Sequence, residues 1–250
     1  GKAAMNGVIS ALIAQKGFTG ARKILEGDRG FFKAMSEHYD ESKITQNLGE
    51  EFKILENSFK IHASCRHTHH AMDLMIGLAK EKPIKLEEID SITVRTYETA
   101  INITDNDEPN TIYGAKFSLQ FCTALAVLKG EGNLAAFNEQ TLWDDEIRTL
   151  MKRVDVVVDP EINAKYPEKW GAKVDILLKS GDTITSVTDF PKGDPENGVS
   201  AEDLFNKFMN LANDLPYEKR KAFAEHVLKM DQIQTINELM EKMVSQEKMI

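Results

Sequence analysis

Strand-forming sequence lies mainly in the middle of this 250-residue chain, and both ends have the composition of helices. The strand-like segments do not alternate regularly with long helices, which favours an α+β fold over a doubly wound sheet. We therefore predict a two-layer α/β central domain at residues 51–192, with helical segments at residues 1–50 and 193–250 that pack together. The predicted strands are residues 53–59, 91–97, 152–159, 172–178 and 183–189, and the predicted helices are residues 3–15, 21–25, 31–38, 69–80, 114–128, 201–213, 217–230 and 233–248.

The composition argues against several classes of function. The net charge is -9, and the chain has no basic stripe with interleaved aromatics, so we expect no nucleic-acid partner. No apolar run approaches the roughly 20 residues that a membrane span needs, so we expect no membrane partner. Two cysteines, Cys65 and Cys122, do not make a disulfide framework. A reducing cytoplasm is therefore the expected location.

Residues 59–70 concentrate the reactive side chains. This stretch holds four of the six histidines together with Lys60, Cys65 and Arg66. The next predicted helix begins inside it, with Thr68 as the candidate N-cap. A junction between a loop and a helix with so many titratable groups is where we look for chemistry.

Two interpretations of the histidines need no organic substrate. Cys65, His67 and His69 alternate along the chain, so an extended segment would place them on one face, and three ligands plus water would make a metal site. The sequence offers no second Cys/His group elsewhere to complete such a site. Alternatively, His62, His70 and the others only cap and pack a turn.

A third interpretation is an acid/base site for a carboxylate. Arg66 offers a planar fork that fits a carboxylate, Lys60 offers a point charge, and a histidine with a pKa near ~6.5 can move protons. The helix N-terminus near Thr68 adds N–H groups that bind anions. Cys65 could be a nucleophile with a pKa lowered by its histidine neighbours, although a small buried residue is the simpler interpretation.

Two other segments carry candidate polar groups. Lys116 and Ser118 lie near the start of the helix predicted at residues 114–128, and Ser118 could equally be satisfied locally. Residues 191–197 have the composition of a surface turn, which could also place Lys192 near an anion.

Several short motifs, in this order, resemble the MmgE/PrpD family. Each motif alone is common, but their number and order along nearly the whole chain are specific. They are Gly17-Phe18-Thr19-Gly20, Leu25-Glu26-Gly27-Asp28-Arg29-Gly30-Phe31, Phe59-Lys60, Ser64-Cys65-Arg66 with Thr68-His69, Ala115-Lys116-Phe117-Ser118, Ser180-Gly181-Asp182 and Pro191-Lys192-Gly193-Asp194-Pro195-Glu196-Asn197.

This resemblance implies a lyase or isomerase that needs no metal or other cofactor and acts on a small di- or tricarboxylate. The family includes 2-methylcitrate dehydratase, cis-aconitate decarboxylase and iminodisuccinate epimerase. Its members have an all-helical domain, built from both ends of the chain, and a smaller α+β domain, with the active site between them. The implied chemistry is proton abstraction α to a carboxylate, followed by elimination or re-protonation.

The resemblance also implies roles for individual residues. Lys60 and His69 match family site positions and are the catalytic candidates, with Cys65 as a second proton donor. The Cys65-Arg66 pair looks most like the epimerase-type members, whereas decarboxylase-type members carry a Tyr where this chain has Phe121. The substrate-binding candidates are Arg66, Lys116, Ser118 and Lys192.

One departure from the family pattern concerns the helical domain. Family members have a long helical region before the segment that resembles residues 1–30, and that region contributes to the active site. We therefore expect most of the all-α domain to be missing, and a homodimer or a partner chain to supply the N-terminal helical half. The alternative function is a catalytically silent, truncated relative that only binds and dimerises.

Overall fold

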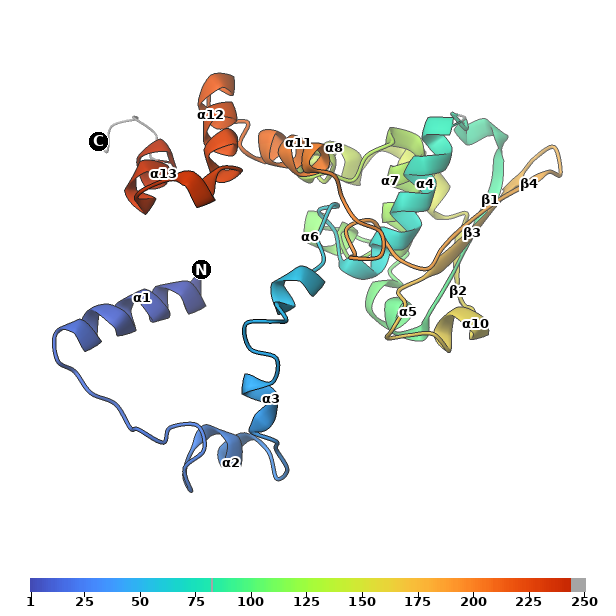
Figure 1. Ribbon diagram of the computed structural model, residues 1–250. Coiled ribbons are helices and arrows are strands. Elements are labelled where there is room, and N and C mark those ends of the chain that lie inside the picture. The colour runs from blue at the N-terminus through green and yellow to red at the C-terminus, as the bar shows by residue number, and fades with distance from the viewer. Residues whose placement is uncertain (82, 244–250) are drawn as a thin grey trace. The chain divides into compact units, whose positions relative to one another are not determined.

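The chain divides into two compact units, Gly1–Ile54 and Leu55–Ile250, which we describe separately (Figure 1). The computed structural model describes residues 1–81 and 83–243. None of the described helices combines the length and the apolar character that crossing a membrane requires.

The first unit is made of short helices with little buried surface. The predicted helix at residues 3–15 is confirmed as α1, and the helix predicted at 31–38 is shorter than expected. The helix predicted at 21–25 is wrong, because those residues form turns. Five residues without tertiary packing rarely sustain a helix, since nucleation is costly. The helices are α1 (Lys2–Gln15), α2 (Phe31–Met35) and α3 (Ser42–Thr45).

The strand predicted at residues 53–59 is also wrong. Lys53–Glu56 forms a 3-10 helix, and residues 57–60 are irregular. Phe59 makes a main-chain bond to a distant segment, donating its N–H to the Gly193 carbonyl at 2.8 Å. A strand needs a continuous ladder with a neighbour, and one bond does not provide it.

The second unit is built on a mixed four-stranded sheet in the order β2-β1-β3-β4. β1 pairs with β2 in parallel and with β3 in antiparallel orientation, so Val94 lies between Val156 and Val174. β3 and β4 form the predicted hairpin around Gly181, whose φ is +92°. The four other predicted strands are confirmed as β1 (Ile89–Thr96), β2 (Val154–Val158), β3 (Ala172–Leu178) and β4 (Thr183–Thr188).

Two helices cover one face of this sheet (Figure 1). They are α4 (His69–Glu81) and α7 (Leu119–Lys129), and every residue of α7 from Leu119 to Val127 is buried. Side chains of alternate sheet positions, such as Val94 and Ile176, are fully buried beneath them. The predicted helix at 114–128 is interrupted, because Ser118 is extended and caps α7. The fold is thus mixed α/β, and an all-α domain shared by the two chain ends stays a prediction.

The remaining helices surround the sheet or follow it. The expected capping box of Ser200 and Asp203 opens α11, and Gly130 ends α7 in the left-handed conformation. Of the last predicted helix, residues 244–248 lie outside the described residues. The other helices are α5 (Glu98–Thr104), α6 (Ile112–Ala115), α8 (Glu139–Leu142), α9 (Asp145–Met151), α10 (Pro160–Asn163), α11 (Ala201–Leu211), α12 (Tyr217–Val227) and α13 (Ile236–Met243).

The contact between Phe59 and Gly193 generates a stability prediction. Gly193 has a φ of +102°, and a Cβ at this position would lie 2.0 Å from the Phe59 carbonyl oxygen. Gly193→Ala adds a steric clash to backbone strain, whereas Gly181→Ala adds strain alone because nothing lies within 4 Å. We expect Gly193→Ala to lower the free energy of unfolding, measured in urea, by about 2 kcal/mol more than Gly181→Ala does. Equal losses would contradict the close approach at Gly193.

Candidate functional site

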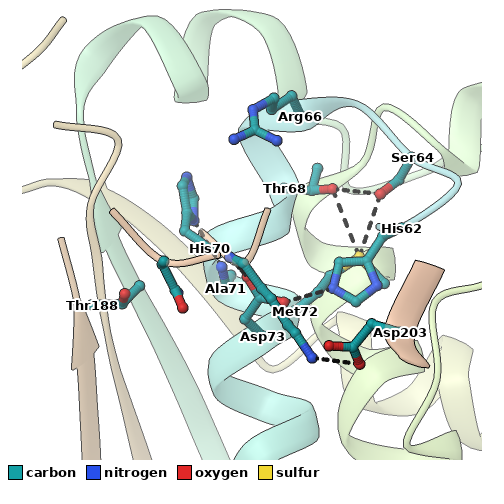
Figure 2. A network of polar contacts seen from close by, with 12 residues as sticks. His62, Ser64, Arg66, Thr68, His70, Ala71, Met72, Asp73, Thr188 and Asp203 are labelled. Carbon is teal, nitrogen blue, oxygen red and sulfur yellow. Dashed lines mark hydrogen bonds and ion pairs between the residues drawn. The ribbon is translucent and has the colours of Figure 1, made fainter. Parts of the chain in front are cut away.

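The candidate site lies where the segment of residues 58–68 enters α4. A 3-10 turn, Arg66–Thr68, precedes α4, so the prediction of Thr68 as its N-cap is wrong. The Thr68 hydroxyl instead donates to the Cys65 carbonyl at 2.8 Å. The hydroxyl oxygens of Ser64 and Thr68 lie 2.8 Å apart (Figure 2). These bonds fix the backbone from which the first α4 residue, His69, projects.

His69 is fully buried and has two unused ring nitrogens. Within residues 1–81 and 83–243, neither nitrogen forms a hydrogen bond of good geometry, although the Ser64 backbone lies close enough to oppose the lowering of the ring's pKa. Burial, followed by the nearby charges of His62, Arg66 and Lys60, lowers the pKa of His69 to about 2. The ring is therefore neutral at physiological pH and offers one donor and one acceptor. Buried polar atoms without partners are rare and call for an explanation, for which a bound ligand is a natural candidate.

His62 forms one wall beside His69 and is itself held by an acid. The two rings meet edge to face, with centroids 4.9 Å apart. His62 Nε2 lies 2.8 Å from an Asp73 carboxylate oxygen (Figure 2). The other Asp73 oxygen accepts the Lys192 N–H at 2.7 Å. Asp73 thus orients His62 and fastens the turn of residues 191–197 to α4.

His70 is a packing residue. Its Nδ1 accepts the Ala71 N–H at 2.8 Å, so Nε2 carries the proton and donates to the Thr96 hydroxyl at 3.2 Å. Thr96 in turn donates to the Gly171 carbonyl at 3.0 Å. Burial lowers the pKa of His70 to about 3.

His67 also has a structural environment. Its ring stacks on Trp170 at 4.6 Å and its Nδ1 lies 2.7 Å from the Tyr97 hydroxyl. The packing interpretation therefore describes His67 and His70, but it leaves the bare nitrogens of His69 unexplained.

The metal interpretation lacks the geometry it requires. Residues 66–68 form a 3-10 turn, so the alternation of Cys65, His67 and His69 does not place them on one extended face. In the described part of the chain, no three His, Cys, Asp or Glu side chains are grouped to hold a metal ion.

Arg66 is engaged by an internal carboxylate. Its guanidinium pairs with Asp194, and the same carboxylate oxygen accepts the Ser58 hydroxyl. The guanidinium also lies 5.9 Å from the Trp170 ring centroid. Because Asp194 belongs to the turn of residues 191–197, this pair ties the turn to the segment of residues 58–68. The expected fork for a substrate carboxylate is thus already paired within the protein.

Comparison with known families identifies the chain. Residues 62–232 match the model of the MmgE/PrpD C-terminal domain, and residues 1–43 match the MmgE/PrpD N-terminal domain. The chain belongs to the MmgE/PrpD family.

Individual relatives are distant. The cis-aconitate decarboxylase-like protein oryM of Aspergillus oryzae is 24% identical over 255 residues, which cover 95% of this chain and 52% of that protein. Cis-aconitate decarboxylase of Mus musculus is 24% identical over 217 residues, which cover 83% of this chain and 43% of that protein. 2-Methylcitrate dehydratase of Escherichia coli is 27% identical over 55% of this chain and 30% of its own length. The chain spans about half the length of the curated relatives it matches first.

The three other substrate-binding candidates of this MmgE/PrpD chain all have protein partners. Ser118 accepts the Phe121 N–H at 3.0 Å and donates to a backbone carbonyl, which is the local satisfaction that the sequence left open. The Lys192 ammonium lies 2.8 Å from Asp203, and the Lys116 ammonium lies 5.7 Å from an aromatic ring centroid. Their substrate-binding roles stay predictions.

The two other catalytic candidates differ in accessibility. Cys65 is partly exposed, and its N–H donates to the Lys116 carbonyl at 2.7 Å. Cys122 is buried, and burial raises the pKa of its thiol to about 12, so it is an unreactive core residue.

Lys60 is exposed, and its carbonyl accepts the ammonium of Lys207 from α11. Sequence reasoning missed Lys207, because a lysine on an amphipathic helix carries no signal beyond a solvated face.

The buried histidines predict a pH-dependent stability. Unfolding restores the ordinary pKa of His70, which is 6.5, so between that value and the folded value only the unfolded chain binds the proton. The stabilising contribution of the neutral histidine is therefore fully present above pH 6.5. Below that pH, the free energy of unfolding falls by about 1.4 kcal/mol per pH unit for each such histidine. When the pH is lowered from about 7 to 5, the free energy of unfolding of His70→Gln, measured in urea, should fall by about 2 kcal/mol less than that of wild type. His38→Gln, at an exposed histidine, is the control, and an unchanged slope in His70→Gln would contradict the buried neutral ring.

Proposed function

We propose that this chain forms a carboxylate-binding, proton-transferring part of an MmgE/PrpD lyase or isomerase. The observation that carries the proposal is His69, a buried neutral imidazole with both nitrogens unused beside the cationic side chains of Lys60 and Arg66. The proposed substrate is a small di- or tricarboxylate, and the supporting relatives include cis-aconitate decarboxylases and a 2-methylcitrate dehydratase.

The proposed reaction begins when an anionic substrate enters the site. An imidazole with a pKa of about 2 is too weak a base by itself. A bound carboxylate would offset the cations around His69 and raise that pKa, so the substrate itself would activate its base. His69 then accepts the proton from the carbon α to the carboxylate, and the charge that develops on the substrate is stabilised by Lys60.

The resulting imidazolium is unstable in this cationic setting and must release its proton. In a dehydratase the proton goes to the departing hydroxyl, which leaves as water. In an epimerase a second group re-protonates the carbon from the opposite face, and the partly exposed Cys65 is the proposed donor. The proton on His69 then returns through solvent to the Cys65 thiolate. The first step is common to both outcomes, so it is the step to test.

Exchange of the α proton in D2O measures this first step without requiring a complete turnover. The full chain is incubated with citrate-like and aspartate-derived carboxylates, and loss of the α-proton NMR signal is followed. His69→Ala should slow exchange about 100-fold or more, and Lys60→Ala about tenfold or more. His226→Gln on α12 is the control and should exchange like wild type. Exchange at the wild-type rate in both variants would overturn the assignment, and no exchange by wild type with any compound would favour the silent, binding-only relative.

A further inference from the structure

Lys207 lies on α11, a helix that the site assignment does not otherwise use. Its ammonium donates to the backbone carbonyl of Lys60, which joins α11 to the segment of residues 58–68. The side chain is partly buried, unlike the exposed Lys60. Two lysines from segments far apart in sequence are therefore brought together at the border of the site.

Neither lysine has its charge balanced by a carboxylate. Within the described residues, Lys60 and Lys207 form no ion pair. The acid one turn earlier on α11, Asp203, is occupied by the Lys192 ammonium at 2.8 Å and by the hydroxyl of Ser200 at 2.9 Å. Burial, followed by the charge of Lys60, lowers the pKa of Lys207.

Two other cations near the site are already paired with carboxylates. Arg66 pairs with Asp194, and Lys192 pairs with Asp203. Adjacent like charges repel, and an anion placed between them removes the repulsion. The charge of Lys60 also reaches His69, whose pKa it lowers. The unbalanced charge of Lys60 is thus close enough to His69 to act on its ring.

We propose that Lys207 and Lys60 together bind a carboxylate of the substrate, with the reacting carbon facing His69. This inference rests on the proposed function and adds a binding residue from α11. It requires a substrate with a carboxylate that is not itself the centre of reaction, as a di- or tricarboxylate provides. An ammonium contributes a point charge with three donors, so Lys207 can bond the Lys60 carbonyl and an anion at the same time.

A purely structural role of Lys207 makes a different prediction. If its bond to the Lys60 carbonyl were all that mattered, Lys207→Gln would retain the function, because an amide N–H can donate to the same carbonyl. If the charge matters, Lys207→Gln should fail and Lys207→Arg should substitute for lysine. The two variants therefore separate the charge from the hydrogen bond.

The test is the affinity of the full chain for propane-1,2,3-tricarboxylate, measured by isothermal titration calorimetry at low ionic strength. Lys207→Gln should weaken binding about tenfold, and Lys207→Arg should stay within about threefold of wild type. Lys179→Gln, at the exposed β3–β4 turn, removes the same charge elsewhere and should bind like wild type.

The outcomes separate this inference from the proposed function. If Lys60→Gln weakens binding while Lys207→Gln behaves like Lys179→Gln, Lys207 is not a ligand and the inference is overturned, although the proposed carboxylate site stands. If wild type does not bind the tricarboxylate, the inference is overturned as well. If Lys207→Gln weakens binding but wild type exchanges no α proton, the anion site is supported and the proposed proton transfer fails.

Discussion

Two carboxylates hold the candidate site together. Asp73 orients His62 and accepts the Lys192 N–H, while Asp194 receives Arg66 and Ser58. Both contacts join the turn of residues 191–197 to the segment that leads into α4. The turn and this segment lie more than a hundred residues apart in sequence, so these bonds give the histidine stretch a defined shape. They add to the backbone bonds that Phe59, Ala63 and Cys65 donate to distant segments.

Two carboxylates, Asp194 and Asp203, decide which positive charges remain for a ligand. Asp194 neutralises Arg66, and Asp203 neutralises Lys192, so two groups that the sequence suggests as anion binders are already paired. Within the described residues, Lys60 and Lys207 form no ion pair, and the charge of Lys60 reaches the buried, neutral His69. Ion pairs with internal partners position the loop, whereas unbalanced cations attract a substrate. This division of roles is the main change that the structure makes to the site expected from the sequence.

Local signals in the sequence predicted the sheet well. Alternation identified β1, and the turn residues 180–182 identified the β3–β4 hairpin. The 53–59 strand failed because strand formation depends on a distant partner, which a local pattern cannot reveal. Ser118 was expected near a helix start, and its capping bond explains why the predicted helix is broken there. The family motifs located Lys60 and His69, and their site roles stay predictions.

Contacts between distant residues were beyond the reach of sequence reasoning. The partner of Arg66 lies 128 residues away, and the lysine beside Lys60 lies 147 residues away. The burial of His69 and the absence of partners for its nitrogens within the described residues are likewise consequences of packing. Four histidines in one stretch look equivalent in sequence, and only their different surroundings separate a packing role from a chemical one.

We propose that His69, whose ring nitrogens have no partner among the described residues, is a neutral base that responds to a carboxylate ligand. NMR of the imidazole nitrogens, assigned with His69→Gln and His70→Gln, tests it directly. In the free protein, the account predicts that His69 stays unprotonated down to about pH 4, because its pKa is lowered by burial and nearby cations. Adding propane-1,2,3-tricarboxylate should shift the ring signals of His69 and leave those of His70 unchanged. A His69 that titrates near its ordinary pKa of about 6.5, or that ignores saturating tricarboxylate, would contradict the account.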